Sequence, residues 1–354
     1  MVATARLGCR FSHDHFDVLR YYCLVIRKTT LTKSKSPQLE YIMKGIECRI
    51  GVDLGGTKIE CIAISRDGHV LTRERVGTPR GMGDETYRAI LGAIRDLILE
   101  IESIIGLKGS VGVGIPGTLS TTTWAVKNAN STSLIGHPLL RDLEDLLQRP
   151  VRLQNDANCF ALSEATDGAA TGADSMFGVI LGTGTGGGIV IQGTLVTGVN
   201  AIGGEWGHNP LPWPRNDELP GPDCYCGKKG CIETFLSGPG LQLTYWSRKR
   251  LRITAEAISH RADAGDRHAD AVLTIYEDRL ARGLATVINM LDPEVIVLGG
   301  GLSNIDRLYD NVPARWSDYV FSDDVCTKLV KAYHGDSSGV RGAAWLWSER
   351  EIWG

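Results

Sequence analysis

Three cysteines and one histidine have the types and spacing of a metal site. Cys224, Cys226 and Cys231 form the pattern C-x-C-x4-C, and His208 lies sixteen positions before the first of them. One imidazole and three thiolates are a complete tetrahedral set for a structural zinc ion, with no position left for a reacting water. A redox dithiol is disfavoured, because the C-x-x-C spacing is absent. The pattern predicts a zinc ion that holds a loop and fixes the flanking Glu205 and Glu233 relative to each other.

Asp156 is the candidate for acid–base chemistry. It follows the alternating segment V-R-L-Q-N, which ends at Asn155, and it precedes a segment typical of a helix, A-N-C-F-A-L-S-E-A. An aspartate in this position is typical of a helix N-cap. It is also suited to act as a general base that takes a proton from a substrate hydroxyl, with Asn155 bonded to a neighbouring hydroxyl. The motif alone favours the cap.

Two glycine-rich turns each join two apolar, β-branched segments. The first contains Gly55, Gly56, Thr57 and Lys58, and the second contains Gly182, Thr183, Gly184 and Thr185. Such turns expose backbone N–H groups that can hold phosphate oxygens, although neither turn has the Walker A or dinucleotide pattern. Each alone could be a tight turn, but the matched pair indicates nucleotide phosphates. Asp53, just before the first turn, is a candidate for a Mg²⁺ ion through water, or for capping the turn.

The elements around these residues predict a duplicated α/β architecture. The strand–glycine turn–strand text at Gly51 returns at Gly178, 127 residues later. The apolar spacing predicts a helix from Asp84 to Ile105, and another over 268–291. A buried strand from Val295 opens into three glycines, of which Gly299 and Gly300 are assigned to the nucleotide. Units of this kind bind ligands in a cleft at the carboxyl ends of their strands.

The composition limits the class of protein. The chain has 354 residues, 43% of them hydrophobic and 22% charged, with a net charge of −3. These values are typical of a globular protein and give no electrostatic reason to bind nucleic acid or an anionic membrane. No apolar run approaches the ~20 residues of a membrane span. Nine cysteines, six of them scattered singly, do not resemble a disulfide framework and indicate a cytoplasmic location.

Residues 1–42 differ from the rest, since they hold seven Lys and Arg against three Asp and Glu and end in a polar, poorly patterned stretch. We expect a poorly ordered extension, or a natural start at Met43.

Taken together, the motifs resemble those of the ROK family of sugar kinases and sugar-responsive repressors. The matching text, over roughly residues 45–345, is D-L-G-G-T-K (53–58), G-I-P-G (114–117), N-D-A-N-C (155–159), L-G-T-G-T-G-G-G (181–188), G-E-W-G-H (204–208) and C-x-C-G-x-x-G-C-x-E (224–233). Within the family, K-N-A-N-S-T (127–132), H-N-P-L-P-W (208–213) and the text over 334–347 are most similar to the bacterial fructokinase branch.

The resemblance implies two ribonuclease-H-like lobes of the actin/hexokinase/Hsp70 type with an interlobe cleft. The expected boundaries are 43–157 and 158–340, with a zinc loop over 203–233 and a C-terminal helix over 341–354 that packs back on the first lobe. It also implies the site residues: Asp156 as catalytic base, Asn130, Asn155, Glu205, His208 and Glu233 as sugar contacts, both glycine turns for Mg-ATP, and His208, Cys224, Cys226 and Cys231 as zinc ligands. His208 would serve metal and sugar through its two nitrogens.

The expected activity is ATP-dependent phosphorylation of the 6-hydroxyl of fructose, and of mannose as a further substrate, by a homodimer. The alternatives are a glucose or N-acetylhexosamine kinase, and a sugar-responsive regulator. The regulator is disfavoured because residues 1–42 are short for a DNA-binding module. We further expect that loss of zinc weakens sugar binding without touching the phosphate-binding turns directly.

Overall fold

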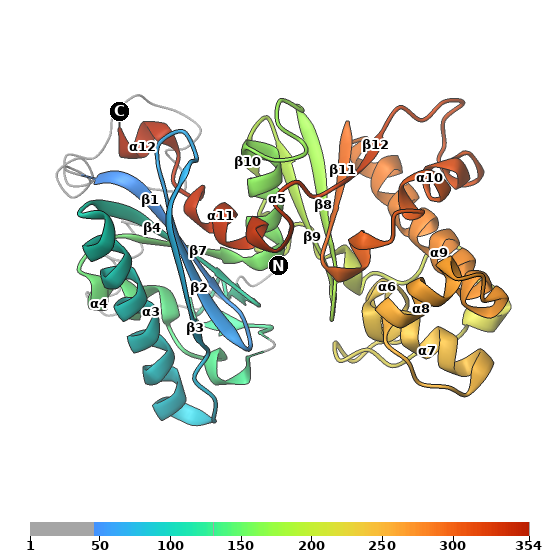
Figure 1. The fold of residues 1–354 in the computed structure, drawn as a ribbon, viewed down its shortest axis with the longest axis horizontal. Helices are drawn as coiled ribbons and strands as arrows, with labels where there is room; N and C mark the ends of the chain where they lie inside the picture. Colours follow the sequence, from blue (N-terminus) through green and yellow to red (C-terminus); the bar gives the residue numbers. More distant parts are fainter. Residues whose placement is uncertain (1–45, 130, 354) are drawn as a thin grey trace, which may run out of the picture. The chain divides into compact units, whose positions relative to one another are not determined.

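The computed structural model describes residues 46–129 and 131–353. The expectations for residues 1–42, Met43 and Asn130 lie outside these residues. Two five-stranded sheets organise the described chain (Figure 1). The first has the order β3-β2-β1-β4-β7. Its strands are β1 (Ile46–Leu54), β2 (Lys58–Ile64), β3 (Val70–Gly77), β4 (Lys108–Ile115) and β7 (Val151–Asn155).

The second sheet repeats the first. Its order is β10-β9-β8-β11-β12. The strands are β8 (Ser175–Leu181), β9 (Thr185–Ile191), β10 (Thr194–Leu195), β11 (Val295–Gly299) and β12 (Lys328–Lys331). In the first sheet β1 pairs antiparallel with β2 and parallel with β4. In the second sheet β8 pairs in the same way, antiparallel with β9 and parallel with β11. The expected duplication and the two-lobed α/β fold are confirmed.

Helices cover both faces of each sheet. The two long ones, α3 (Gly83–Ile105) and α9 (Arg267–Leu291), match the sequence prediction within one residue at each end. The others are α4 (Leu139–Leu147), α5 (Asp156–Thr166), α6 (Ile232–Leu236), α7 (Gly238–Lys249), α8 (Ala255–Asp263), α10 (Leu308–Asn311), α11 (Ser338–Ala344) and α12 (Glu349–Ile352). A two-stranded ribbon joins β5 (Thr118–Leu119) and β6 (Val126–Lys127). Among the residues described, no helix combines the length and apolar character that a membrane span requires.

Side-chain alternation assigns the faces of the first sheet. Ile50 and Val52 of β1 are fully buried in the core that they share with α3, as expected for a strand covered on both sides. Between them, Gly51 faces α11 instead. A Cβ atom on Gly51 would lie 2.0 Å from the carbonyl oxygen of Val340, and one on Gly112 of β4 would lie 1.9 Å from that of Ala343. The helix backbone therefore rests directly on the sheet.

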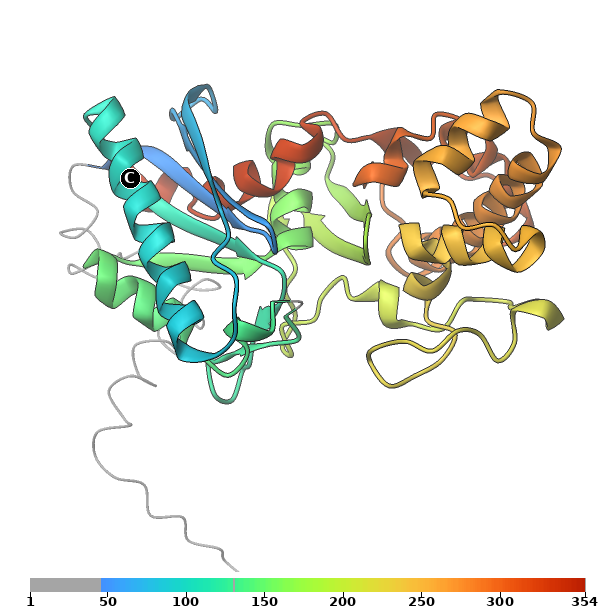
Figure 2. The same ribbon diagram turned by 60° about the horizontal axis from the view of Figure 1, so that its bottom comes forward.

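Helices α5 and α11 join the two sheets, and both lie between them in Figures 1 and 2. α5 packs on β8 and β9, whereas α11 packs on β1 and β4 and against α5. Their contact is made through Gly342, where a Cβ would lie 1.6 Å from the carbonyl oxygen of Cys159. The boundary expected between residues 157 and 158 falls in the first turn of α5 and stays a prediction.

Carboxylates at the end of α5 hold the chain where it returns from the second sheet to α11. The fully buried Glu164 accepts hydrogen bonds from the Ser338 hydroxyl at 2.7 Å and from the Tyr333 N–H at 2.9 Å. Asp167 forms an ion pair with Arg341 of α11. A buried carboxylate needs such partners, because its charge is otherwise costly to bury. The junction between the sheets is thus closed by packing and by charge.

Replacement of Gly342 by Ala should destabilise the protein severely. The added methyl group meets the Cys159 backbone, which cannot rotate away, so we expect a loss of about 3 kcal/mol or more in the free energy of unfolding, measured by urea denaturation. Gly92→Ala in α3 is the matched control, because its Cβ meets nothing within 4 Å. It should stabilise by roughly 0.5–1 kcal/mol, as for Ala over Gly inside a helix. Equal effects of the two variants would contradict this packing.

Candidate active site

Asp156 lies where β7 of the first sheet passes into α5. The N-cap is Asn155, whose side-chain oxygen accepts hydrogen bonds from the N–H groups of Ala157 at 2.9 Å and Asn158 at 3.3 Å. Asn155, not Asp156, is therefore the N-cap, and the role of Asp156 as a base stays a prediction. One Asp156 oxygen also accepts from Ala157 N–H, at 2.8 Å. The Asp156 side chain is only partly buried, so a substrate can approach it.

The capping role restricts what Asn155 can offer a ligand. Its oxygen is committed to the helix, and its amide nitrogen donates to the carbonyl oxygen of Gly117 at 3.3 Å. One amide hydrogen is left for a further partner. The predicted sugar contact at Asn155 therefore reduces to a single donated hydrogen bond.

Two neighbouring carboxyl groups titrate far above their ordinary range. Burial, followed by the negative charges of Asp156 and Glu60, raises the pKa of Asp53 to about 6. Burial also raises the pKa of Asp156 to about 6, helped by the charge of Glu205 and opposed by the Ala157 N–H. Asp53 lies against the first turn of α11, since a Cβ on Gly339 would lie 3.3 Å from its carboxylate. Raised pKa values of this kind are common where a general base or a cation is placed.

The two glycine turns offer matching pairs of backbone N–H groups. In the first, Gly55 N–H bonds to the Lys58 carbonyl oxygen at 3.0 Å, and in the second, Gly182 N–H bonds to that of Gly184, also at 3.0 Å. The N–H groups between have no hydrogen-bond partner in the described part of the chain. They belong to Gly56 and Thr57, and to Thr183 and Gly184. Each turn is thus shaped to receive an anion between its strands.

Two predicted nucleotide residues are engaged by the protein itself. The Lys58 ammonium donates to Glu60 at 3.1 Å. The Thr185 hydroxyl is buried, and the backbone N–H of Thr185 donates to the carboxylate of Glu233 at 2.9 Å. Glu233 follows the cysteine cluster by two residues, so this bond connects the predicted zinc loop with the second glycine turn. The expected effect of zinc loss stays a prediction.

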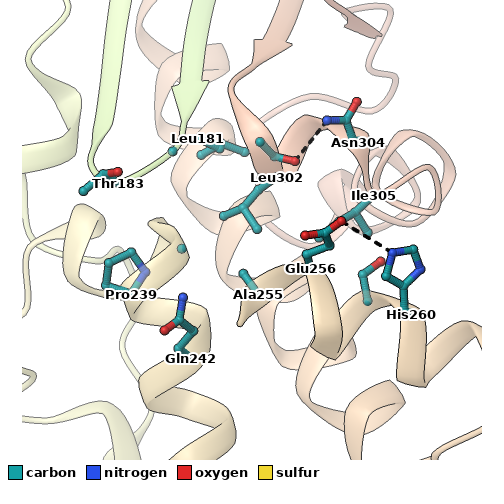
Figure 3. Close-up of a pocket in the computed structure, with 14 residues that line it drawn as sticks. Leu181, Thr183, Pro239, Gln242, Ala255, Glu256, His260, Leu302, Asn304 and Ile305 are labelled. Carbon is teal, nitrogen blue, oxygen red and sulfur yellow. Dashed lines mark hydrogen bonds and ion pairs between the residues drawn. The ribbon is translucent and has the colours of Figure 1, made fainter. Parts of the chain in front are cut away.

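A cavity of about 740 Å³ adjoins the second glycine turn (Figure 3). Its wall is apolar at Leu181, Ala255, Leu302 and Ile305, and polar groups of α7 and α8 face it. The polar residues are Gln242, Glu256, Ser259, His260 and Asn304. A volume of this size with a mainly apolar wall and a few polar groups suits a small organic ligand such as a nucleobase with its ribose.

Gly299, which ends β11, and Gly300, which follows it, are required by packing and backbone conformation, and their predicted contact with the nucleotide stays a prediction. A Cβ on Gly299 would lie 2.4 Å from the Phe160 ring, and one on Gly300 would lie 2.5 Å from the Leu181 carbonyl oxygen, at a φ of +79°. Packing and backbone conformation thus require both glycines. The next residue, Gly301, lines the cavity.

The cysteine–histidine cluster has the geometry of a metal site. The four ligand atoms of His208, Cys224, Cys226 and Cys231 lie within 4.8 Å of one another. The Cys224 sulfur is 3.6 Å from His208 Nδ1, and the Cys226 and Cys231 sulfurs are 3.6 Å apart. Ligands of a tetrahedral zinc with bonds of roughly 2.3 Å lie about 3.8 Å apart, so the cluster fits such an ion.

The other nitrogen of His208 faces a residue that the sequence analysis missed. Nε2 lies 2.9 Å from the Tyr225 hydroxyl, and the two rings meet edge to face. The charges of Glu233 and Glu205 act on Tyr225, which places these groups on one face of the zinc loop. Tyr225 thus stands where the resemblance implied a sugar hydroxyl. The sequence signal that could have identified Tyr225 is its position between Cys224 and Cys226, two of the predicted ligands.

The model of the ROK family matches residues 49–350. The chain belongs to the ROK family. Among curated relatives, this ROK protein is 41% identical over 300 residues to an N-acetyl-D-glucosamine kinase of Yersinia pseudotuberculosis, a match that covers 84% of the chain and 97% of the relative.

Two solved structures show the same fold. The ROK hexokinase from Thermus thermophilus has a TM-score of 0.74 at 31% identity, covering 84% of this chain and 96% of that one. A ROK glucokinase from Streptomyces griseus, solved with glucose and AMPPNP, has a TM-score of 0.69 at 27% identity, covering 84% and 98%.

The expectation of a fructokinase is wrong. Curated relatives at 40–41% identity, spanning 84% of the chain, are named N-acetyl-D-glucosamine kinases. The error came from giving weight to three short stretches, of residues 127–132, 208–213 and 334–347, within a frame that the family's branches share.

Asp156→Asn should stabilise the folded ROK protein at alkaline pH and much less at acid pH. The folded-state pKa, about 6, lies above the ordinary value of 3.8, so burying the charged form costs stability once the pH exceeds both values. We expect a gain of roughly 1–3 kcal/mol in the free energy of unfolding at pH 8 and less than about a third of this at pH 4, from urea denaturation.

The control for this variant is Asp145→Asn, at an exposed carboxylate of α4 beside Arg141. It should change stability by less than about 0.5 kcal/mol at both pH values. A gain for Asp156→Asn that is independent of pH would contradict the buried charge.

Proposed function

We propose that this ROK protein is an ATP-dependent kinase that transfers the γ-phosphoryl group to the primary hydroxyl of N-acetyl-D-glucosamine or a closely similar N-acetylhexosamine. The observation that carries the proposal is the partly buried carboxylate of Asp156, whose charge interacts with Asp53 before the first glycine turn and with Glu205, and whose pKa is raised to about 6. The names of the curated relatives support the choice of sugar.

The nucleotide is assigned to the second sheet. The base and ribose would occupy the cavity between α7, α8 and the chain after β11, and the phosphates would reach the N–H groups of Thr183 and Gly184 at its inner end. The first turn would hold the terminal phosphate through Gly56 and Thr57. Bound Mg²⁺ supplies positive charge that offsets the charge of the phosphates, and Asp53 is the carboxylate placed to hold it through water.

The sugar is assigned to the face formed by Asn155, Glu205 and Glu233, with Tyr225 in place of a direct contact from His208 and with the primary hydroxyl at Asp156. Asp156 accepts the hydroxyl proton as the oxygen attacks the γ-phosphorus, the bond to the β-phosphate oxygen breaks, and ADP leaves. A pKa of about 6 leaves the carboxylate ionised at neutral pH while keeping it more basic than an exposed aspartate. Positioning of the two reactants supplies most of the remaining acceleration.

The metal cluster is proposed to hold one zinc ion per chain, bound by three thiolates and His208 Nδ1. A closed tetrahedral site has no position for substrate, so this zinc would stabilise the loop. Thiolate ligands require reduced cysteines, which supports a cytoplasmic location for the kinase. The homodimer stays a prediction.

A coupled ADP-release assay tests the function. We expect kcat/KM for N-acetyl-D-glucosamine to exceed that for glucose, mannose and fructose by at least tenfold, because a site that pairs an amide rejects sugars that lack it. Asp156→Asn should lower kcat by 10²- to 10⁴-fold, the usual contribution of a general base. A preference for a sugar without the acetamido group, or unchanged turnover in the variant, would refute the assignment.

Metal analysis of Cys226→Ala tests the zinc site. We expect about one zinc per chain in the wild type and its loss in the variant, with a rise in the KM for both sugar and ATP, because Glu233 follows the cluster and contacts Thr185. Cys326→Ala is the matched control, since Cys326 is also exposed and free but lies outside the cluster. Zinc retained in Cys226→Ala with unchanged KM values would rule out this site.

A further inference from the structure

The carboxylate of Glu233 joins the two substrate regions. Its Oε2 atom accepts the N–H of Thr185, the last residue of the second glycine turn, at 2.9 Å. Within the described chain this is the only hydrogen bond to the carboxylate, so Oε1 is free. One oxygen therefore binds the turn assigned to nucleotide phosphate, and the other is available on the face assigned to sugar.

The fit between Glu233 and the turn is close. A Cβ atom on Gly184 would lie 2.6 Å from Oε2, so the absence of a side chain there lets the carboxylate reach the backbone. The other end of the turn is held as well, because Gly238 N–H donates to the Gly182 carbonyl oxygen at 2.8 Å. The turn is thus docked at both ends onto the segment from α6 to the start of α7.

The same segment is bonded to the loop that carries His208. Ile232 N–H donates to the Asn209 carbonyl oxygen at 2.8 Å, and Leu211 N–H donates to that of Gly230 at 2.9 Å. Glu233 follows directly in the first turn of α6. Its backbone is therefore fixed relative to the sugar face, and what is left to vary is the rotamer of its side chain.

We propose that Glu233 is a positioning residue that makes the binding of sugar and nucleotide cooperative. The inference rests on the proposed function. A sugar hydroxyl donating to Oε1 fixes the glutamate rotamer, and this fixes the Thr185 N–H and the turn beside it. Nucleotide then binds a turn whose ordering cost has already been met. By linkage, nucleotide raises sugar affinity by the same factor.

Charge acts in the same direction. The Glu233 carboxylate lies next to Gly184, whose N–H is assigned to phosphate, so an unliganded carboxylate repels the nucleotide. A hydroxyl donated to Oε1 disperses that charge, as hydrogen bonds to an ionised group do. Sugar binding thus both orders the turn and lowers the repulsion.

Calorimetry on the full chain measures the coupling directly. The probe is AMPPNP with Mg²⁺, titrated with and without saturating N-acetyl-D-glucosamine, and the coupling factor is the ratio of the two Kd values. We expect at least a fivefold tightening by sugar in the wild type, the lower end of typical coupling. Glu233→Ala should reduce the factor to below twofold, whereas Glu233→Gln, which keeps an acceptor oxygen for Thr185 N–H, should retain more than half of it.

Gly184→Ala tests the contact between Glu233 and the turn without changing the glutamate itself. Its methyl group displaces the carboxylate but leaves both oxygens present, so the factor should again fall below twofold. Gly92→Ala in α3 is the matched control, since its Cβ meets nothing within 4 Å and it lies outside both proposed binding regions, so the factor should keep its wild-type value. If Gly184→Ala weakens nucleotide equally with and without sugar, leaving the factor unchanged, the coupling is overturned.

The same data separate this inference from the proposed function. A wild type that turns over N-acetyl-D-glucosamine but shows a factor near one overturns the coupling alone. A wild type that neither binds nor phosphorylates an N-acetylhexosamine overturns both.

Discussion

The close approach of α11 to its neighbours is the constraint on which the site depends. Three glycines remove the side chains that would separate this helix from β1, β4 and α5, and the distances involved allow no other residue. Because α11 rests on the first sheet and α5 on the second, their contact links the two sheets. Asp53 and Asp156 come close enough to raise each other's energy when ionised, as the shift at Asp53 records. The packing of α11 and α5 therefore contributes to the raised pKa of Asp53.

This arrangement keeps two carboxylates in a place that disfavours their charge. Burial is the first cause at both residues, and it outweighs the compensating groups. These are the Ala157 N–H, the Asn155 side chain and its own N–H for Asp156, and the Lys58 ammonium for Asp53. Elsewhere the same fold neutralises buried acids fully, for example Glu218 between Arg279 and Arg282. That contrast separates the two kinds of buried acid. A carboxylate left short of partners is suited to react or to meet a cation, whereas a fully paired one stabilises the fold.

Much of the fold followed from local pattern, because apolar periodicity and glycine punctuation are local signals. We predicted from the sequence the ends of α3 and α9, the repeated sheets and the cysteine–histidine cluster. The Glu233–Thr185 bond was not, since it joins residues 48 positions apart and one of its partners is a backbone N–H. The cavity was missed because α7 and α8 carry no phosphate-binding motif. The pattern at Gly299 and Gly300 predicted a ligand contact but not the packing against Phe160 and Leu181, which by itself requires both glycines. Sugar identity depends on hydroxyl and amide geometry, which a six-residue stretch does not determine.

The cysteine cluster was expected to position the sugar-binding residues. Because Glu233 connects it to the second glycine turn, it can also affect the residues assigned to phosphate. With the proposed zinc bound, Cys231 would limit the backbone freedom of Glu233 two residues later. Glu233 in turn contacts a turn that has only short-range hydrogen bonds of its own. A kinase needs a rigid site where the phosphate and the hydroxyl must meet at bonding distance, and a flexible one where the substrates enter. In the proposed site, the cysteine–histidine loop supplies the rigidity, and the rotamer of Glu233 is the flexible part between the sugar face and the second glycine turn.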